Sequence, residues 1–298
     1  MAARSKPAGF TLVELAVVLT IVTLLLTSLM YTLSAQMNQR NIDETRRRLD
    51  QARELILSYA VVKGRMPCPA YYRTAVDNSA GRESFCTSAA TSSTSSCVSS
   101  ETTTEQSHGT CSNHYDGYLP AVSIGFPQVD PSGFAIDAWG NRIRYAVART
   151  IASGTCNGIQ TPPNLFRTMF TSKTYLQTYG MTRQPDDLLI CKNYSDATLG
   201  TVTGSSCGGA QNQVMSQSLV VGVVFSTGKN GATSPTGGGT DESTNLKTNA
   251  ALSPQINPIF VFHTPTDSSA PNGEFDDQFT WITIGELYGK LIAAGLLP

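Results

Sequence analysis

Residues 10–33 have the sequence FTLVELAVVLTIVTLLLTSLMYTL, in which Glu14 is the only charged residue. As a helix with a rise of about 1.5 Å per residue, this stretch would reach roughly 36 Å, enough to cross the roughly 30 Å hydrocarbon core of a bilayer. Arg4 and Lys6 precede it, and no charge follows it until Arg40. The positive-inside bias therefore predicts one transmembrane helix at 10–33, with a cytoplasmic N-terminus and an exported C-terminal part.

Glu14 distinguishes this stretch from an ordinary secretory signal peptide, which a basic start and an apolar run would also fit. A charge in a spanning helix costs about 2.5–3.5 kcal/mol even on the lenient insertion scale, so an intramembrane carboxylate indicates a function. The apolar run also exceeds the usual length of a signal peptide core, and its best cleavage site, Leu33-Ser34-Ala35, has leucine where a small residue is required. A cleaved signal peptide or a plain membrane anchor is the alternative.

Residues 6–15, KPAGFTLVEL, resemble the class III signal of type IV prepilins and type II secretion pseudopilins. This resemblance implies a leader at 1–9, cut after Gly9 by a prepilin peptidase, and methylation of the new N-terminus at Phe10. It also implies that Glu14 pairs with the N-terminal amine of a neighbouring subunit during assembly. A carboxylate in hydrocarbon needs a cationic partner, so elementary electrostatics favours the same pairing.

Residues 34–63 are expected to continue the helix with an amphipathic pattern, so that one long helix covers 10–63. Apolar residues recur at three- and four-residue intervals, with Leu49 and Ile56 on one face and charged residues on the other. Gly64 and Pro67 then end the helix. The expected head comprises residues 64–298.

The head has the pattern of an α+β domain in which the long helix packs on an antiparallel sheet. Strands are predicted at 143–148, 219–225 and 259–263, the last two in a central sheet, and a helix at 284–295. Two polar segments, 71–117 and 228–249, are predicted to be large surface loops. The resemblance to type IV prepilins implies that this α+β domain has the type IV pilin fold. GRMPCPA, DAWGNRIRYAV and the C-terminal sequence from Phe275 are similar to large minor pilin-like proteins of Gram-negative bacteria.

All seven cysteines lie after the apolar stretch, where an exported domain meets an oxidising environment. We expect two or three disulfides that pin the loops, with connectivity open and at least one cysteine left over or paired between chains. The candidates are Cys68, Cys86, Cys97, Cys111, Cys156, Cys191 and Cys207.

Calcium is the ion that the sequence suggests for the C-terminal part of the head, and no cofactor is predicted. Oxygen ligands gather in a glycine-containing loop before a predicted strand, as calcium prefers, although their spacing is not that of an EF-hand. A solvated acidic loop is the alternative. These residues are Asp267, Asn272, Glu274, Asp276 and Asp277.

Composition excludes some functions of the head. The chain has a net charge of -1 and the head is mildly acidic, so no nucleic-acid partner is predicted. Three scattered histidines give no catalytic grouping, and the protein is expected to be the substrate of an enzyme rather than an enzyme itself.

The resemblance predicts a pilus subunit that is held in the inner membrane, with a periplasmic head, before assembly. The large head favours a minor subunit, at the tip or at initiation, because small heads repeat more easily along a filament. Its expected partners are other pilin or pseudopilin subunits, the prepilin peptidase, an inner-membrane assembly platform and membrane lipid. A type II secretion pseudopilin and a membrane-anchored periplasmic binding protein are the alternatives.

Overall fold

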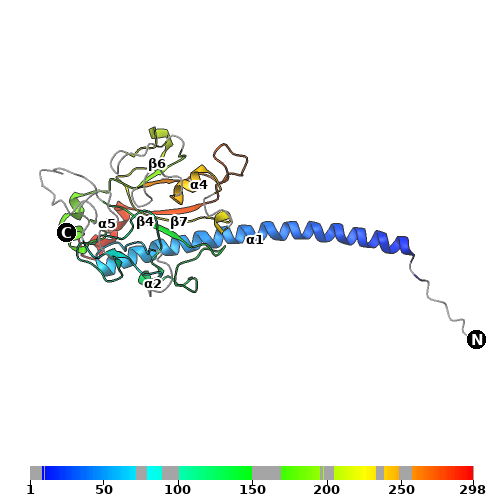
Figure 1. Ribbon diagram of the computed structural model, residues 1–298, viewed down its shortest axis with the longest axis horizontal. Coiled ribbons are helices and arrows are strands. Elements are labelled where there is room, and N and C mark those ends of the chain that lie inside the picture. Colours follow the sequence, from blue (N-terminus) through cyan, green and yellow to red (C-terminus); the bar gives the residue numbers. More distant parts are fainter. Residues whose placement is uncertain are drawn as a thin grey trace, which may run out of the picture. The chain divides into compact units, whose positions relative to one another are not determined.

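The computed structural model describes residues 9, 11–71, 79–88, 101–149, 169–194, 197, 205–232, 238–247 and 257–297, with only the backbone described at 28–32, 181 and 232. The chain divides into two compact units, Met1–Asp43 and Glu44–Pro298. Element labels follow Figure 1.

One long helix, α1, runs from Leu12 to Lys63 (Figure 1). It ends at Gly64, whose φ of 73° lies in the left-handed region that glycine adopts without strain and whose N–H donates to the carbonyl of Ala60 at 2.8 Å. In the second unit its predicted apolar stripe is buried, with Leu49 and Ile56 at most 2% exposed. The C-terminal part of α1 is therefore part of the core of the head.

The central sheet is antiparallel and has four described strands in the order β3-β4-β7-β9. Val224 of β7 lies opposite Tyr145 of β4, and Val223 lies opposite Trp281 of β9. β7 is buried along its whole length, as its continuous apolar sequence predicted. The strands are β3 (Gly117–Tyr118), β4 (Arg144–Val147), β7 (Val220–Ser226) and β9 (Gln278–Thr283).

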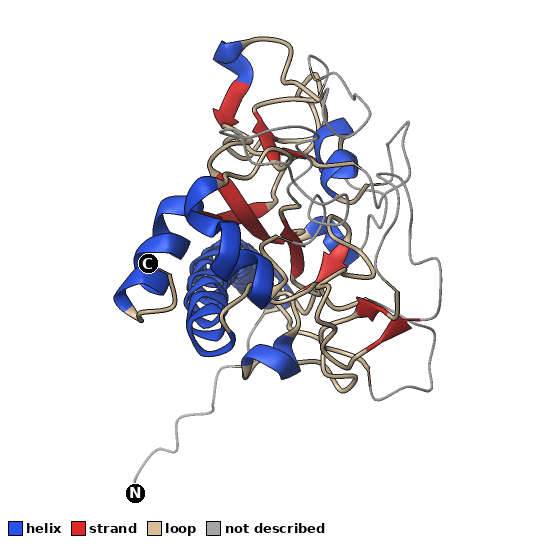
Figure 2. Cartoon of the chain, turned by 90° about the vertical axis from the view of Figure 1, so that its left-hand side faces the viewer, coloured by secondary structure: helices blue, strands red, loops and turns tan. Residues whose placement is uncertain are grey.

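The last helix, α5 (Ile284–Ala293), lies beside the C-terminal part of α1 and packs on β9 and β7 (Figure 2). Thr283 and Glu286 form a capping box at its start, and Leu287 and Leu291 are buried. Arg53 of α1 donates to the carbonyl of Trp281 at 3.1 Å and forms an ion pair with Glu286. The predicted C-terminal helix is confirmed.

A second sheet has three described strands in the order β6-β5-β8. The expectation that residues 259–263 belong to the central sheet is wrong, because β8 pairs in parallel with β5, opposing Phe260 to Ile190. An apolar run records burial but not the partner strand, so the sequence could not make this assignment. The strands are β5 (Leu189–Cys191), β6 (Gln213–Met215) and β8 (Ile259–Val261).

Both predicted surface loops contribute to the interior, which corrects the sequence-based expectation. In the first, Phe85 is fully buried in a two-stranded pair, and Tyr115 is 1% exposed. The second contains α4, whose Asn245 bonds both the N–H and the carbonyl of Val261. Polar side chains there satisfy buried backbone groups, so a polar composition did not mean exposure. The remaining elements are β1 (Phe85–Cys86), β2 (Glu101–Thr102), α2 (Ala121–Ile124), α3 (Lys173–Tyr179), α4 (Thr240–Asn245), η2 (Gly180–Thr182), η3 (Ala210–Asn212) and η4 (Asn230–Ala232).

Candidate functional site

Glu14 lies in the first turn of α1, where it forms a reciprocal capping arrangement with Thr11. Its carboxylate accepts from the backbone N–H and the hydroxyl of Thr11, both at 2.9 Å, and its own N–H donates to the Thr11 hydroxyl oxygen at 3.3 Å. Such a capping box satisfies amide donors that a helix start leaves unpaired. The Thr-Leu-Val-Glu spacing carries this signal in the sequence, and our sequence reasoning missed it. The Thr11 N–H and hydroxyl are both neutral, so the negative charge of Glu14 has no cationic partner among the described residues.

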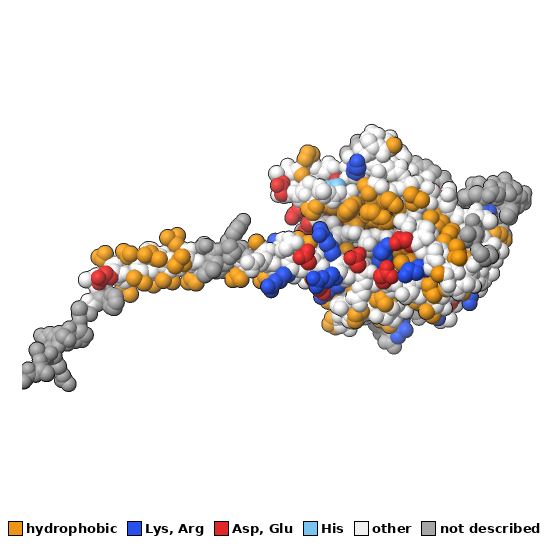
Figure 3. Space-filling view, turned by 180° about the vertical axis from the view of Figure 1, so that it is seen from behind, with side chains coloured by type: hydrophobic (Ala, Val, Ile, Leu, Met, Phe, Trp, Pro, Cys, Tyr) orange, Lys and Arg blue, Asp and Glu red, His pale blue; other side chains and the backbone are white. Residues whose placement is uncertain are grey.

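The helix that follows Glu14 is apolar on all sides. Leu15, Leu19 and Leu25 are at least 56% exposed, and hydrophobic side chains cover the visible face of this segment (Figure 3). Thr20, Thr23 and Thr27 each donate their hydroxyl to a backbone carbonyl three or four residues earlier, at 2.8–2.9 Å. The threonines thereby satisfy their own polar groups without water. A surface of this kind requires an apolar environment of lipid or protein.

Part of the expected transmembrane segment lies outside the description of the structure. Phe10 is not described, nor are the side chains of residues 28–32. Among the described residues, no helix has an apolar stretch long enough to cross a membrane.

A model of the prokaryotic N-terminal methylation motif matches residues 4–30. The chain carries a class III prepilin signal. The matched segment includes Gly9, Phe10 and Glu14, and it is typical of type IV pilins and pseudopilins. The signal implies processing by a prepilin peptidase, anchoring in the inner membrane and assembly with pilin subunits. Proteins with this signal are generally structural rather than enzymatic. No curated protein and no solved structure matched the chain.

Disulfides pin the head of this prepilin-like protein, as predicted. Cys68 is bonded to Cys111, across 43 residues, and Cys191 is bonded to Cys207, across 16. Cys86 is disulfide-bonded as well. The remaining candidates, Cys97 and Cys156, lie outside the described residues.

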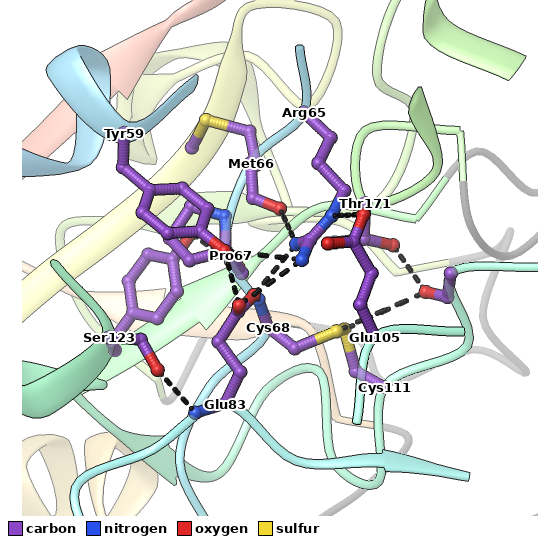
Figure 4. A network of polar contacts seen from close by, with 12 residues as sticks. Tyr59, Arg65, Met66, Pro67, Cys68, Glu83, Glu105, Cys111, Ser123 and Thr171 are labelled. Atoms are coloured by element: carbon purple, nitrogen blue, oxygen red, sulfur yellow. Dashed lines mark hydrogen bonds and ion pairs between the residues drawn. A yellow bond between two sulfur atoms is a disulfide. The ribbon is translucent and has the colours of Figure 1, made fainter. Parts of the chain in front are cut away.

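A buried ionic network joins the end of α1 to the first disulfide (Figure 4). Arg65 and Glu83, 1% and 6% exposed, form two hydrogen bonds of 2.7 and 3.1 Å between guanidinium and carboxylate. Glu83 also accepts from the N–H of Cys68 at 2.7 Å and from the Tyr59 hydroxyl. Arg65 donates further to Glu105 at 2.9 Å.

The Arg65 guanidinium keeps its charge despite its burial. Burial alone disfavours the charged guanidinium, but the hydrogen bonds to Glu83 and Glu105 outweigh it and raise the pKa of Arg65. Burial, together with the charge of Glu83, raises the pKa of Tyr59. No spacing rule relates these residues, so sequence reasoning missed them.

Three carboxylates meet where α4 approaches the loop before β9. Oxygen atoms of Glu242, Asp276 and Asp277 lie within 4.8 Å of one another. Burial and the charge of Glu242 raise the pKa of Asp276 to about 7, and the same two causes hold the pKa of Asp277 well above its usual range. A divalent cation held by these oxygens would relieve that repulsion, because hard carboxylate ligands suit calcium.

The structure brings together two of the five residues proposed for calcium. Asp276 and Asp277 join Glu242, which sequence reasoning missed because α4 was expected to be loop. Asp267 instead accepts from the N–H and hydroxyl of Ser269. Asn272 donates to Asp241 at 2.9 Å, and Glu274 is not part of the cluster.

Proposed function

We propose that this protein is a minor subunit of a type IV pilus that acts at the tip or at initiation. The match of residues 4–30 to the methylation motif supports a prepilin, and the large head favours a minor subunit over the bulk subunit. In it, the peptidase cuts after Gly9 and methylates Phe10, while α1 holds the chain in the inner membrane with the head in the periplasm. The inner-membrane platform then moves the subunit from lipid into the filament.

Glu14 is the residue that specifies assembly in this proposal. Its capping bonds to Thr11 supply neutral donors, which do not compensate a charge in an apolar environment. The amine created at Phe10 on a neighbouring subunit supplies the missing cation. One such pair fixes the axial stagger between two helices, because any other register leaves both charges unpaired in an apolar environment.

Intact-mass measurement tests the processing step. The full chain, co-expressed with a prepilin peptidase, is expected to begin at Phe10 and to carry one additional methyl group. A chain that is uncut, or that begins at Ala35, would refute the proposal. An uncut chain would instead support the membrane-anchored alternative, and cleavage by an ordinary signal peptidase would support a secreted protein.

Three substitutions separate charge pairing from helix capping. Glu14→Val and Glu14→Gln should both insert and be cleaved normally yet be depleted from sheared filaments, because both remove the charge. Glutamine can keep the hydrogen bonds to Thr11, so normal incorporation of Glu14→Gln would show that capping matters and charge does not. Thr11→Val is the matched control: it breaks the capping box, at about 1 kcal/mol of helix stability, and keeps the charge.

The main alternative is a type II secretion pseudopilin, which would use the same signal and the same Glu14 pairing. Quantitative mass spectrometry of sheared pili decides between these roles and between a minor and a major subunit. A minor pilin should be present at a small fraction of the major subunit. Equal abundance would contradict the minor role, and absence from pili together with loss of protein secretion in a deletion strain would favour the pseudopilin.

A further inference from the structure

The head contains a groove of about 540 Å³ between the central sheet and the β6-β5-β8 sheet. Phe279 of β9 and Val214 of β6 line it, as do Phe262 and Pro265 from the segment after β8. Arg46 of α1 and Lys192, which follows β5, also line it. An apolar surface with a few charged groups and this volume is typical of a ligand-binding groove.

The apolar wall of the groove is a preformed aromatic cluster. Phe262 lies 5.8 Å from Phe279 and 5.6 Å from Trp281, measured between ring centroids. Phe279 also stacks on Phe225, a buried residue of the core, at 4.8 Å. These rings are anchored on one side and only partly buried on the other. A continuous hydrophobic patch is visible on this face of the head (Figure 3), and exposed apolar patches of this kind mark interaction sites.

β9 supplies an open strand edge beside this wall. It is the last strand of the central sheet and pairs only with β7 among the described strands. Arg53 contacts the carbonyl of Trp281, but no described strand pairs with that edge. A strand edge that lacks a partner strand is a template for one more strand, supplied by another chain.

The charges around the groove favour an acidic occupant. Arg46 and Lys192 are exposed and form no ion pair in the described part of the chain, whereas Arg48 and Arg53 are paired with Glu44 and Glu286. Asp277 also lines the groove, but it is 4% exposed and its carboxylate accepts from the Asn245 side chain within the head. Unpaired cations beside an apolar wall select a ligand that has both carboxylates and apolar side chains.

We propose that this groove binds an extended, acidic and apolar peptide segment of a partner protein, which adds a strand to the edge of β9. Its apolar side chains contact Phe262 and Phe279, and its carboxylates pair with Arg46 and Lys192. The open edge favours an extended backbone over a compact small molecule. This inference goes beyond the proposed pilus role and does not depend on it.

Peptide binding to the full chain in lipid nanodiscs tests the proposal by fluorescence anisotropy. The probe is a fluorescein-labelled eight-residue peptide in which phenylalanine or valine alternates with glutamate. One comparison peptide has lysine for glutamate, and another has two central prolines, which cannot extend a sheet. We expect the glutamate peptide to bind at least about tenfold more tightly than either.

Charge reversal localises the binding. Arg46→Glu with Lys192→Glu should lower the affinity for the glutamate peptide by about tenfold and make the lysine peptide the tighter ligand. The matched control is Arg47→Glu with Lys229→Glu, two exposed residues that do not line the groove, and it should leave the order unchanged. Hydrogen exchange of residues 278–283 should slow when the glutamate peptide binds, because strand addition protects edge amides.

Three results would overturn the proposal. Equal binding of the proline peptide, or no effect of the groove charge reversal, would exclude strand addition at this site. Self-association that is lost in Arg46→Glu with Lys192→Glu, seen by analytical ultracentrifugation, would assign the groove to a second copy of the chain. Tighter binding of dioctanoyl phosphatidylglycerol than of any peptide would assign it to lipid.

Discussion

Glu83→Ala should be among the most damaging single substitutions in the head. The change leaves the Arg65 guanidinium, whose side chain is 1% exposed, without its bidentate partner. It also removes the acceptor of the Cys68 N–H. Breaking a buried ion pair by removing one partner costs about 3–5 kcal/mol, because the other charge stays buried and uncompensated. Glu105 still accepts from Arg65, so we expect a loss of about 3–4 kcal/mol in the free energy of unfolding.

Two variants calibrate that value. Glu83→Gln keeps the shape and an acceptor oxygen, so it should cost about 1–2 kcal/mol. Glu105→Ala removes a partner whose side chain is 45% exposed, and solvent screening should limit its cost to under about 1 kcal/mol.

Urea titration of the oxidised full chain in nanodiscs measures these differences. Trp139 and Trp281, the only tryptophans, both belong to the head, so their fluorescence reports its unfolding. The reasoning is refuted if Glu83→Ala costs under 1 kcal/mol or if Glu105→Ala costs as much as Glu83→Ala.

Two further predictions concern the disulfides and the carboxylate cluster. Replacing Cys68 and Cys111 together with serine should cost about 4 kcal/mol, and replacing Cys191 and Cys207 about 3 kcal/mol, because the longer loop constrains the unfolded chain more; equal urea midpoints for the two variants would contradict this order. Asp276 has a pKa of about 7 in the folded chain, so the folded chain still binds a proton that the unfolded chain has released by about pH 5. Without metal, the free energy of unfolding should therefore fall as the pH rises from 4 to 7. The expected fall is about 2 kcal/mol after allowance for solvent screening. Asp276→Asn should flatten this pH dependence, and millimolar calcium should restore the stability of the unmutated chain at pH 8. If the pH profiles of the unmutated chain and of Asp276→Asn are the same and a chelator changes neither, the prediction for this carboxylate cluster is wrong.

The sequence predicted those parts of the head that depend on periodicity or on an uninterrupted apolar run. Leu49 and Ile56 recur with helical spacing and face the core, and residues 219–225 have no polar position, which is typical of a strand buried on both faces. The helix at 284–295 was predictable for the same reason. Each of these signals is local, so a single segment contains all the information.

The remaining features depend on contacts between distant segments. Arg65 and Glu83 are 18 residues apart, and neither has a neighbour that indicates burial of a charge. Glu242 meets Asp276 across 34 residues, through a short helix whose polar composition resembles a loop. Tertiary packing brings such residues together, and the local secondary-structure propensity of the sequence does not predict it. The capping box of Thr11 and Glu14 is different, because its three-residue spacing is local and could have been predicted from the sequence.

Arg53 connects the start of the head to its end, because its contacts with Trp281 and Glu286 span 228 and 233 residues. Contacts of such high sequence separation form late. At a translation rate of about 5–20 residues per second, the stripe around Leu49 is synthesised roughly ten to fifty seconds before β9 and α5 can cover it. The head therefore cannot complete its folding progressively from the N-terminus. A chain truncated before β9 would keep a complete processing signal yet expose this stripe.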